Sequence, residues 1–428
     1  MSAALVVAPT RRHLVRADGS PFFWLGDTAW ELFHLLDREE AEFYLRTRAT
    51  QGFTVVQAVA LAEFEGLTRP NPYGHLPLEG NDPTRPVEAY FQHVDWIVAR
   101  ANALGITVAF VPTWGDKWNK AWGIGPEIFT PQNAEVFGEW LGRRYRDADL
   151  VWILGGDREV KTDAHRAILR AMAAGLQRGD GGTHLMTLHP NGHHASSQYV
   201  HQEEWLDFNM IQSGHGEKDL ANWAMLAHDA SLQPAKPYME AEPCYENHPV
   251  RHRPDQGWFE AWDVRKLCWW GLLAGGFGHT YGCHDIWGFH DPVRQRRFAD
   301  PRTAWWEALH FPGANQMRHA RRLLLSRPLL KLVPDQQLIA GDAGAGADHI
   351  QAARADDGSY AYLYSASGRP IAVAAERLAG ATLRAAWLDP RSGFSTAIGE
   401  LRRQGFPVFT PPTAGTGCDW VLVLDAVG

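Results

Sequence analysis

The stretch Val151-Trp152-Ile153-Leu154-Gly155-Gly156-Asp157 decides the fold prediction, because it is a short apolar strand that delivers a carboxylate at its C-terminal end. A second stretch of this kind, Pro237-Tyr238-Met239-Glu240-Ala241-Glu242, follows further along the chain. In a (β/α)8 barrel the functional side chains lie at the C-terminal ends of the strands. The two stretches therefore predict a barrel that carries acids at one face.

Strand-like apolar runs alternate with amphipathic segments of helix length. We expect strands at residues 22–26, 53–60, 106–113, 150–155, 184–188, 208–212, 237–241 and 278–282. We expect helices at residues 38–51, 87–104, 131–146, 162–177, 219–232, 263–273 and 305–325. This alternation predicts a (β/α)8 TIM barrel. A doubly wound sheet is less favoured, because no glycine-rich phosphate turn follows the first strand.

The pattern changes after Ser326-Arg327-Pro328. Short strands at residues 337–340, 360–365, 371–374, 383–388 and 420–424 alternate with turns rich in Gly, Pro and Asp. Such spacing is typical of a small antiparallel β-sandwich. We therefore predict a catalytic barrel over residues 1–326 and an accessory β-sandwich domain over residues 327–428.

The composition excludes several classes of partner. The net charge is −8, with 41 Lys and Arg against 49 Asp and Glu and no basic run, so a nucleic-acid partner is not expected. No apolar run is long enough to span a membrane, and the N-terminal residues lack a secretory signal pattern, so we expect a cytoplasmic protein. The four cysteines show no CxxC spacing, which argues against a zinc knuckle or a disulfide framework.

The candidate catalytic acids follow the fourth and seventh predicted strands. Asp157 comes after two glycines that leave room for a ligand, although an Asp at a strand end can also cap the next helix. Glu240 and Glu242 share parity, so both are expected to point into the barrel, with Glu242 nearer the rim. A salt bridge without chemistry is the alternative for each. Two carboxyl groups that face one pocket are what glycoside hydrolysis needs.

Five motifs follow one another along the chain: Phe23-Trp24-Leu25-Gly26-Asp27-Thr28-Ala29-Trp30, Gly52-Phe53-Thr54-Val55-Val56-Gln57, Leu154-Gly155-Gly156-Asp157, Glu242-Pro243-Cys244-Tyr245-Glu246 and Gly278-His279-Thr280-Tyr281-Gly282. Taken together and in this order, they resemble the apiosidase-like (DUF4038-type) glycosidases of glycoside hydrolase family 140. The resemblance covers residues 10–325 approximately, and the tail is similar to a collagen-binding-type β domain.

The resemblance implies a retaining exo-glycosidase that removes a terminal apiosyl or related furanosyl or pyranosyl residue from small glycosides or oligosaccharides. Asp157 would be the acid/base and Glu242 the nucleophile. Glu240 departs from the family pattern, so it is kept as the reserve nucleophile.

Further residues are candidates for holding the sugar. Several also have a structural alternative: a helix cap for Asp27, polar filling of the barrel for Gln57, and core packing for the tryptophans. The predicted substrate-binding set is Asp27, Gln57, Trp114, His189, His215, Glu240, Tyr281 and Trp287.

The histidines at positions 189, 193, 194 and 201 raise the possibility of a metal. They lack the HExxH pattern, so neither a metal nor another cofactor is expected. A non-hydrolytic carbohydrate-binding protein and a His-ligated metallohydrolase stay as alternatives. The expected partner is a small carbohydrate or glycoside. An oligomer is possible, because Trp258, Trp262, Trp269 and Trp270 could line either a subunit contact or the domain junction.

Overall fold

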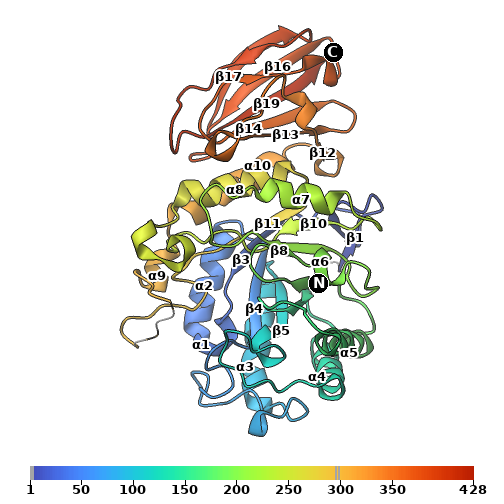
Figure 1. Cartoon of the computed structure of the whole chain (residues 1–428), viewed down its shortest axis with the longest axis vertical. Helices are drawn as coiled ribbons and strands as arrows, with labels where there is room; N and C mark the ends of the chain where they lie inside the picture. Colours follow the sequence, from blue (N-terminus) through green and yellow to red (C-terminus); the bar gives the residue numbers. More distant parts are fainter. Residues whose placement is uncertain (1–3, 295, 297–298) are drawn as a thin grey trace.

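The computed structural model describes residues 4–294, 296 and 299–428. In this part of the chain, eight parallel strands form a nearly closed barrel (Figure 1). They are β3 (Trp24–Thr28), β4 (Val55–Leu61), β5 (Thr107–Thr113), β6 (Leu150–Gly155), β7 (Met186–His189), β9 (Asn209–Gln212), β10 (Tyr238–Glu240) and β11 (Gly278–Tyr281). The barrel prediction is confirmed, and every expected strand lies within two residues of an observed one.

The sheet closes where β11 pairs with β3. At the opposite seam, between β7 and β9, the Asp207 amide donates to the Met186 carbonyl at 2.9 Å. The short strand β8 (His194–Ala195) runs antiparallel to β9 at this seam.

Helices surround the strands. The long ones are α2 (Arg38–Thr50), α3 (Glu88–Ala103), α4 (Pro131–Tyr145), α5 (Asp163–Asp180), α7 (Asn222–Ala230), α8 (Ala261–Leu273) and α10 (Pro312–Leu325), and the short ones are α1 (Leu32–Leu35), α6 (Ser197–Val200) and α9 (Trp305–Ala308). Loops over the barrel contain the 3-10 turns η1 (Glu79–Asn81), η2 (Gly115–Lys117), η3 (Val250–His252) and η4 (Pro254–Gln256). The single helix expected at 305–325 is broken in two, because Pro312 starts a new helix at its first position. None of the described helices is long and apolar enough to cross a membrane.

Two apolar layers hold the barrel. Inside it, Trp24, Val59 and Met239 pack with other inward side chains of the strands. A hairpin that the sequence did not predict, β1 (Leu5–Val7) and β2 (Leu14–Arg16), adds Leu5 and Leu14 to this inner cluster. The hairpin therefore contributes to the filling of the barrel interior.

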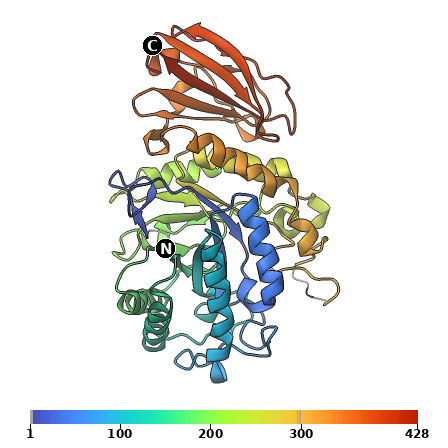
Figure 2. The same cartoon turned by 180° about the vertical axis from the view of Figure 1, so that it is seen from behind.

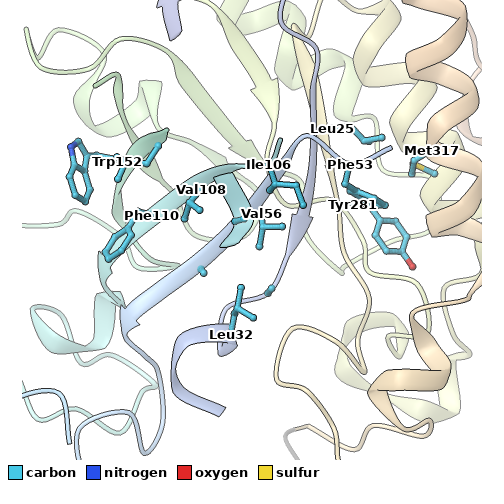
Figure 3. Close-up of a cluster of buried hydrophobic side chains, with 14 of the residues drawn as sticks. Leu25, Leu32, Phe53, Val56, Ile106, Val108, Phe110, Trp152, Tyr281 and Met317 are labelled. Carbon is cyan, nitrogen blue, oxygen red and sulfur yellow. The ribbon is translucent and has the colours of Figure 1, made fainter. Parts of the chain in front are cut away.

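The outer layer lies between strands and helices. Figure 3 shows part of it, where Val56, Val108, Phe110 and Trp152 project from the neighbouring strands β4, β5 and β6. Valine and aromatic side chains suit such doubly covered parallel strands. The outward side chains alternate with the inward ones, and this alternation decides which polar residues can reach a ligand.

The C-terminal domain is antiparallel. Its main sheet has the order β12 (Leu332–Pro334), β13 (Ile350–Ala355), β14 (Tyr360–Ser365), β19 (Trp420–Val427), β16 (Thr382–Leu388) and β17 (Ser395–Arg402), and β15 (Ile371–Ala372) pairs with β18 (Val408–Phe409). The 3-10 turn η5 (Leu329–Lys331) leads from α10 to β12, and η6 (Gln336–Leu338), η7 (Gly346–Asp348) and η8 (Ala375–Arg377) lie between strands. The strand expected at 337–340 is wrong. η6 covers Gln337 and Leu338, where the Asp335 side chain accepts from the Gln337 amide, and Ile339 makes an isolated antiparallel bridge to Val373.

The junction between the domains is buried. Helices α7, α8 and α10 lie between the barrel and the antiparallel sheet (Figures 1 and 2). Arg265 on α8 donates two hydrogen bonds to Asp419, at 2.8 and 2.6 Å. Trp269 stacks on Tyr364 with ring centroids 5.8 Å apart, and Trp270 donates to a backbone carbonyl of the C-terminal domain. These tryptophans therefore line the domain junction.

A buried ion pair ties the first strand to its helix. Asp27 on β3 points outward, where its Oδ2 accepts from Arg48 Nε at 2.6 Å and from the Tyr44 hydroxyl at 2.5 Å. Both members of the ion pair are fully buried. Burial raises the pKa of Asp27, and the positive charge of Arg48 opposes that rise. Asp27 thus joins β3 to α2.

We expect Asp27→Asn to lower the free energy of unfolding by about 3–5 kcal/mol, because it leaves a buried guanidinium without its charge partner. Denaturant titration followed by tryptophan fluorescence would measure the change. The control is Glu79→Gln, which removes an exposed ion pair with Arg85 and should cost less than about 1 kcal/mol. Equal losses in the two variants would contradict the structural role of Asp27.

Candidate active site

A cavity of about 650 Å³ opens at the C-terminal ends of the strands. Its wall combines acids, histidines and aromatic rings. The side chains include Trp30, Glu63, Phe64, Trp114, Trp122, Asp157, Asn191, His193, Gln212, His215, Glu242, Tyr245, His248, Arg251, His252 and Trp287. A volume of this order matches small-molecule sites in general.

Asp157 reaches the cavity through a sharp turn after β6. Gly155, Gly156 and Asp157 all have positive φ angles, of 93°, 97° and 53°. A Cβ on Gly155 would lie 2.4 Å from the His189 carbonyl oxygen, and one on Gly156 would lie 2.7 Å from the Gly115 amide nitrogen. The two glycines are therefore required by space as well as by conformation. A non-glycine residue held at positive φ, such as Asp157, is typical of functional sites.

Glu242 enters the cavity because the register changes just after β10. The amides of Ala241 and Glu242 both donate to the Ile211 carbonyl, at 2.8 and 3.3 Å. Two residues then face one, as in a β-bulge, and the alternation of side chains is interrupted. Ala241 faces the barrel interior and Glu242 follows it into the cavity.

Glu240 points the other way, so the prediction that it faces inward is wrong. Its carboxylate accepts from the Ser213 amide and from Asn222 Nδ2 on α7, each at 3.1 Å. Its Cβ lies beside Gly271 on α8. Burial raises the pKa of Glu240 to about 7. Glu240 and Glu242 therefore point to opposite sides of the sheet although they are two residues apart, because the bulge-like step lies between them.

Two histidines contact Glu242. His189 Nε2 lies 2.9 Å from Oε2, and His215 Nε2 lies 3.3 Å from Oε1. Burial alone would raise the pKa of Glu242, but these two histidines outweigh it and bring the pKa below its ordinary value. The carboxylate form of Glu242 is therefore favoured.

Asp157 has the opposite electrostatic setting. Burial, followed by the negative charges of Glu242 and Glu63, raises its pKa well above the ordinary value, and Arg158 opposes the rise only in part. The pocket therefore contains one carboxyl group that favours the protonated form and one that favours the ionised form. Such a divergence of pKa values separates an acid from a base or nucleophile.

The other predicted substrate-binding residues divide into two groups. Trp114, His215 and Trp287 line the cavity, and His189 lies directly behind Glu242. Asp27, Gln57, Glu240 and Tyr281 are not among the cavity-lining residues. Gln57 donates to the Ala241 carbonyl at 3.2 Å inside the barrel, and the Tyr281 hydroxyl donates to Glu246 at 2.6 Å. The side chains of Asp27 and Tyr281 point outward from the barrel, toward the helices, so their contacts are structural.

Sequence reasoning missed several lining residues. Gln212 is the last residue of β9, and Asp157 likewise lies at the C-terminal end of its strand, β6. The position of Gln212 at a strand end could therefore have identified it as a candidate site residue. Glu63, Trp122, His248 and His252 lie in loops, and no spacing in the sequence indicates that they reach the cavity. The His215 and His248 rings stack with centroids 4.2 Å apart. Burial and the neighbouring histidines lower the pKa of His248, which favours its neutral form.

Among the residues that the structure describes, no three His, Cys, Asp or Glu side chains are grouped so that they could hold a metal ion. His194 and His201, which belong to the predicted histidine cluster, hydrogen-bond within the protein, to the Gly192 and Pro234 carbonyls.

We expect Gly156→Ala to destabilise the protein more than Gly182→Ala does. Both glycines have positive φ, but a Cβ on Gly182 meets nothing within 4 Å, whereas one on Gly156 collides with the backbone of the Trp114–Gly115 segment. The control, Gly182→Ala, should lose only the conformational penalty of a positive φ, about 1 kcal/mol of stability. Gly156→Ala should lose more, because the steric collision is added to that penalty. Thermal unfolding of the two variants measures the difference, and equal midpoints would contradict the tight packing of this turn.

Comparison with known families covers nearly the whole chain. Residues 8–331 match the family described as "Apiosidase-like, catalytic domain". Residues 333–425 match the "Putative collagen-binding domain of a collagenase". No curated protein matches the sequence.

Two solved structures are similar over nearly the full length of this chain. A glycoside hydrolase family 5 protein from Bacteroides vulgatus ATCC 8482 has 32% identity and a TM-score of 0.91, with 99% of this chain and 92% of that chain covered. A second glycoside hydrolase has 31% identity and a TM-score of 0.90, with 99% and 97% covered. A family 5 mannosidase from Rhizomucor miehei shares the fold alone, at 13% identity and a TM-score of 0.57, with 76% and 98% covered. The chain therefore belongs to the apiosidase-like glycosidases, with a catalytic barrel followed by a domain of the collagen-binding type.

Proposed function

We propose that this glycosidase is a retaining exo-acting enzyme in which Glu242 is the nucleophile and Asp157 the acid/base. The observation that carries the proposal is the opposite charge preference of two carboxyl groups in one pocket: the pKa of Asp157 is raised and that of Glu242 is lowered. A nucleophile must be ionised and a general acid must hold a proton at the same pH. The two environments meet both requirements.

The reaction would take two steps. Glu242 attacks the anomeric carbon and forms an ester bond, while Asp157 gives its proton to the departing oxygen. Asp157, now a carboxylate, then removes a proton from water, which attacks the anomeric carbon and restores the Glu242 carboxylate. The mechanism requires a separation of the two carboxyl groups of about 5–5.5 Å.

The surroundings of the pair suit a single terminal sugar. Trp114 and Trp287 offer apolar faces to a sugar ring, and Asn191, Gln212 and His193 bring polar groups to the same cavity. The family resemblance supports an apiosyl or related furanosyl residue at the non-reducing end. We propose small glycosides or oligosaccharides as the substrates.

We expect Glu242→Gln to abolish turnover and leave sugar binding largely intact, because the amide is nearly isosteric but cannot form the ester bond. We expect Asp157→Ala to lower kcat/KM by about 10²–10⁴ on substrates with poor leaving groups and much less on activated aryl glycosides. Steady-state kinetics on aryl apiosides and arabinofuranosides would measure both effects.

The matched control is Glu240→Gln, which changes the reserve nucleophile outside the cavity and should leave kcat within a few-fold of its original value. NMR of the first-formed sugar in the same reactions reports the stereochemistry. Unchanged hydrolysis by Glu242→Gln, or an inverted first product, would contradict the mechanism.

We expect a bell-shaped dependence of kcat/KM on pH. Activity should fall at low pH as Glu242 is protonated, below the ordinary glutamate value of 4.5, because the histidines lower its pKa. It should fall at high pH as Asp157 loses its proton, well above the ordinary aspartate value of 3.8. In Asp157→Ala, assayed with an activated aryl glycoside, the alkaline limb should disappear. An alkaline limb that persists would assign that titration to another group.

A further inference from the structure

We propose that Glu63 and Arg158 form a positioning pair that sets the proton affinity of Asp157, an inference that rests on the proposed acid/base role of Asp157. Neither residue belongs to the catalytic pair. They act through the Asp157 carboxyl group, which must hold a proton in the first step and accept one in the second.

One buried guanidinium contacts both carboxyl groups. Arg158 Nη2 lies 3.0 Å from Glu63 Oε1, and Nη1 lies 3.4 Å from Asp157 Oδ2. Nη1 also donates to the Asp157 backbone carbonyl at 2.8 Å. The side chain of Arg158 has no exposed surface. Its charge is therefore shared between the two acids, and the closer contact is with Glu63.

The surroundings restrict the guanidinium. The ring of Trp122 stacks against it, with the centroid 4.2 Å from Cζ. A Cβ on Gly115 would lie 2.5 Å from Arg158 Cγ, and a Cβ on Gly123 would lie 2.6 Å from Nη2. The loop after β5 thus packs closely on Arg158, with Gly115 against the aliphatic part of the side chain and Gly123 against the guanidinium.

Nearby charged groups have partners of their own. Asp116 is 2.7 Å from Lys117 Nζ, and Glu31 is 2.8 Å from His34 Nδ1. Glu242 is contacted by His189 and His215. Within the described part of the chain, Arg158 is the cation that pairs with Asp157, and Glu63 competes with Asp157 for it.

The ionisation of Glu63 falls in the working range of many enzymes. Burial raises its pKa to about 7 although Arg158 opposes the rise. When Glu63 ionises, it adds negative charge beside Asp157 and takes a larger share of Arg158. Both effects favour the protonated form of Asp157. When Asp157 has given up its proton, Arg158 is already in place to stabilise the carboxylate.

The test is Glu63→Gln, which keeps the shape of the side chain and removes its negative charge. We expect the alkaline limb of the kcat/KM profile to move down by about one pH unit, because Asp157 loses a repelling neighbour and gains Arg158. The acidic limb, set by Glu242, should stay in place. Glu63→Asp keeps the charge and should restore most of the original limb. Glu65→Gln, two residues away in an exposed ion pair with Arg69, should shift neither limb.

A second readout does not depend on activity. In protein labelled with ¹³C at the aspartate carboxyl groups, the Asp157 resonance is the one missing from Asp157→Asn, and its titration gives the pKa directly. We expect a lower pKa for Asp157 in Glu63→Gln. The same Asp157 pKa with and without Glu63 would overturn the positioning role, even in an active enzyme. Absence of hydrolysis by the wild-type protein would overturn the proposed function, while the titration would still decide the role of the pair.

Discussion

Two carboxyl groups that share one buried pocket cannot both ionise without a large electrostatic penalty, and the histidines around Glu242 decide which of them carries the charge. His189 and His215 both contact Glu242, so the negative charge is stabilised there. Burial raises the pKa of Asp157, and the negative charge of Glu242 adds to that rise. The division of labour between acid and nucleophile thus follows from the one-sided placement of two imidazole rings.

The backbone brings these groups together by two local irregularities. After β6, three successive positive φ angles turn Asp157 into the pocket, and after β10 a bulge-like step does the same for Glu242. Both irregularities rest on regular structure that is packed on both faces. The buried ion pair of Asp27 with Arg48, for example, fixes β3 to α2, and the two irregular segments lie at the rim of the barrel.

The regular part of this design was readable from the sequence. The apolar runs predicted all eight barrel strands to within two residues. Parallel strands that are buried on both faces consist of nearly uninterrupted apolar residues, so they are easy to recognise in a sequence. Parity, counted from the inward Trp24, would also have placed Asp27 outside the barrel. The direction of the Glu240 side chain could not be predicted from the sequence. The change of register between Glu240 and Glu242 is not visible in the alternation of apolar and polar residues. Loop residues such as Glu63 and Trp122 were not predicted as cavity-lining residues, because their positions depend on loop conformations that the periodicity of the sequence does not describe. The cytoplasmic location stays a prediction.

The buried contact between Arg265 and Asp419 has a consequence for how the chain can be divided. With Trp269 and Trp270 packed against the C-terminal sheet, the two domains share an interior at this point. A barrel produced alone would expose two large indole rings and leave a guanidinium without its carboxylate. We would expect such a fragment to aggregate, so the two domains depend on each other for solubility in spite of their different architectures.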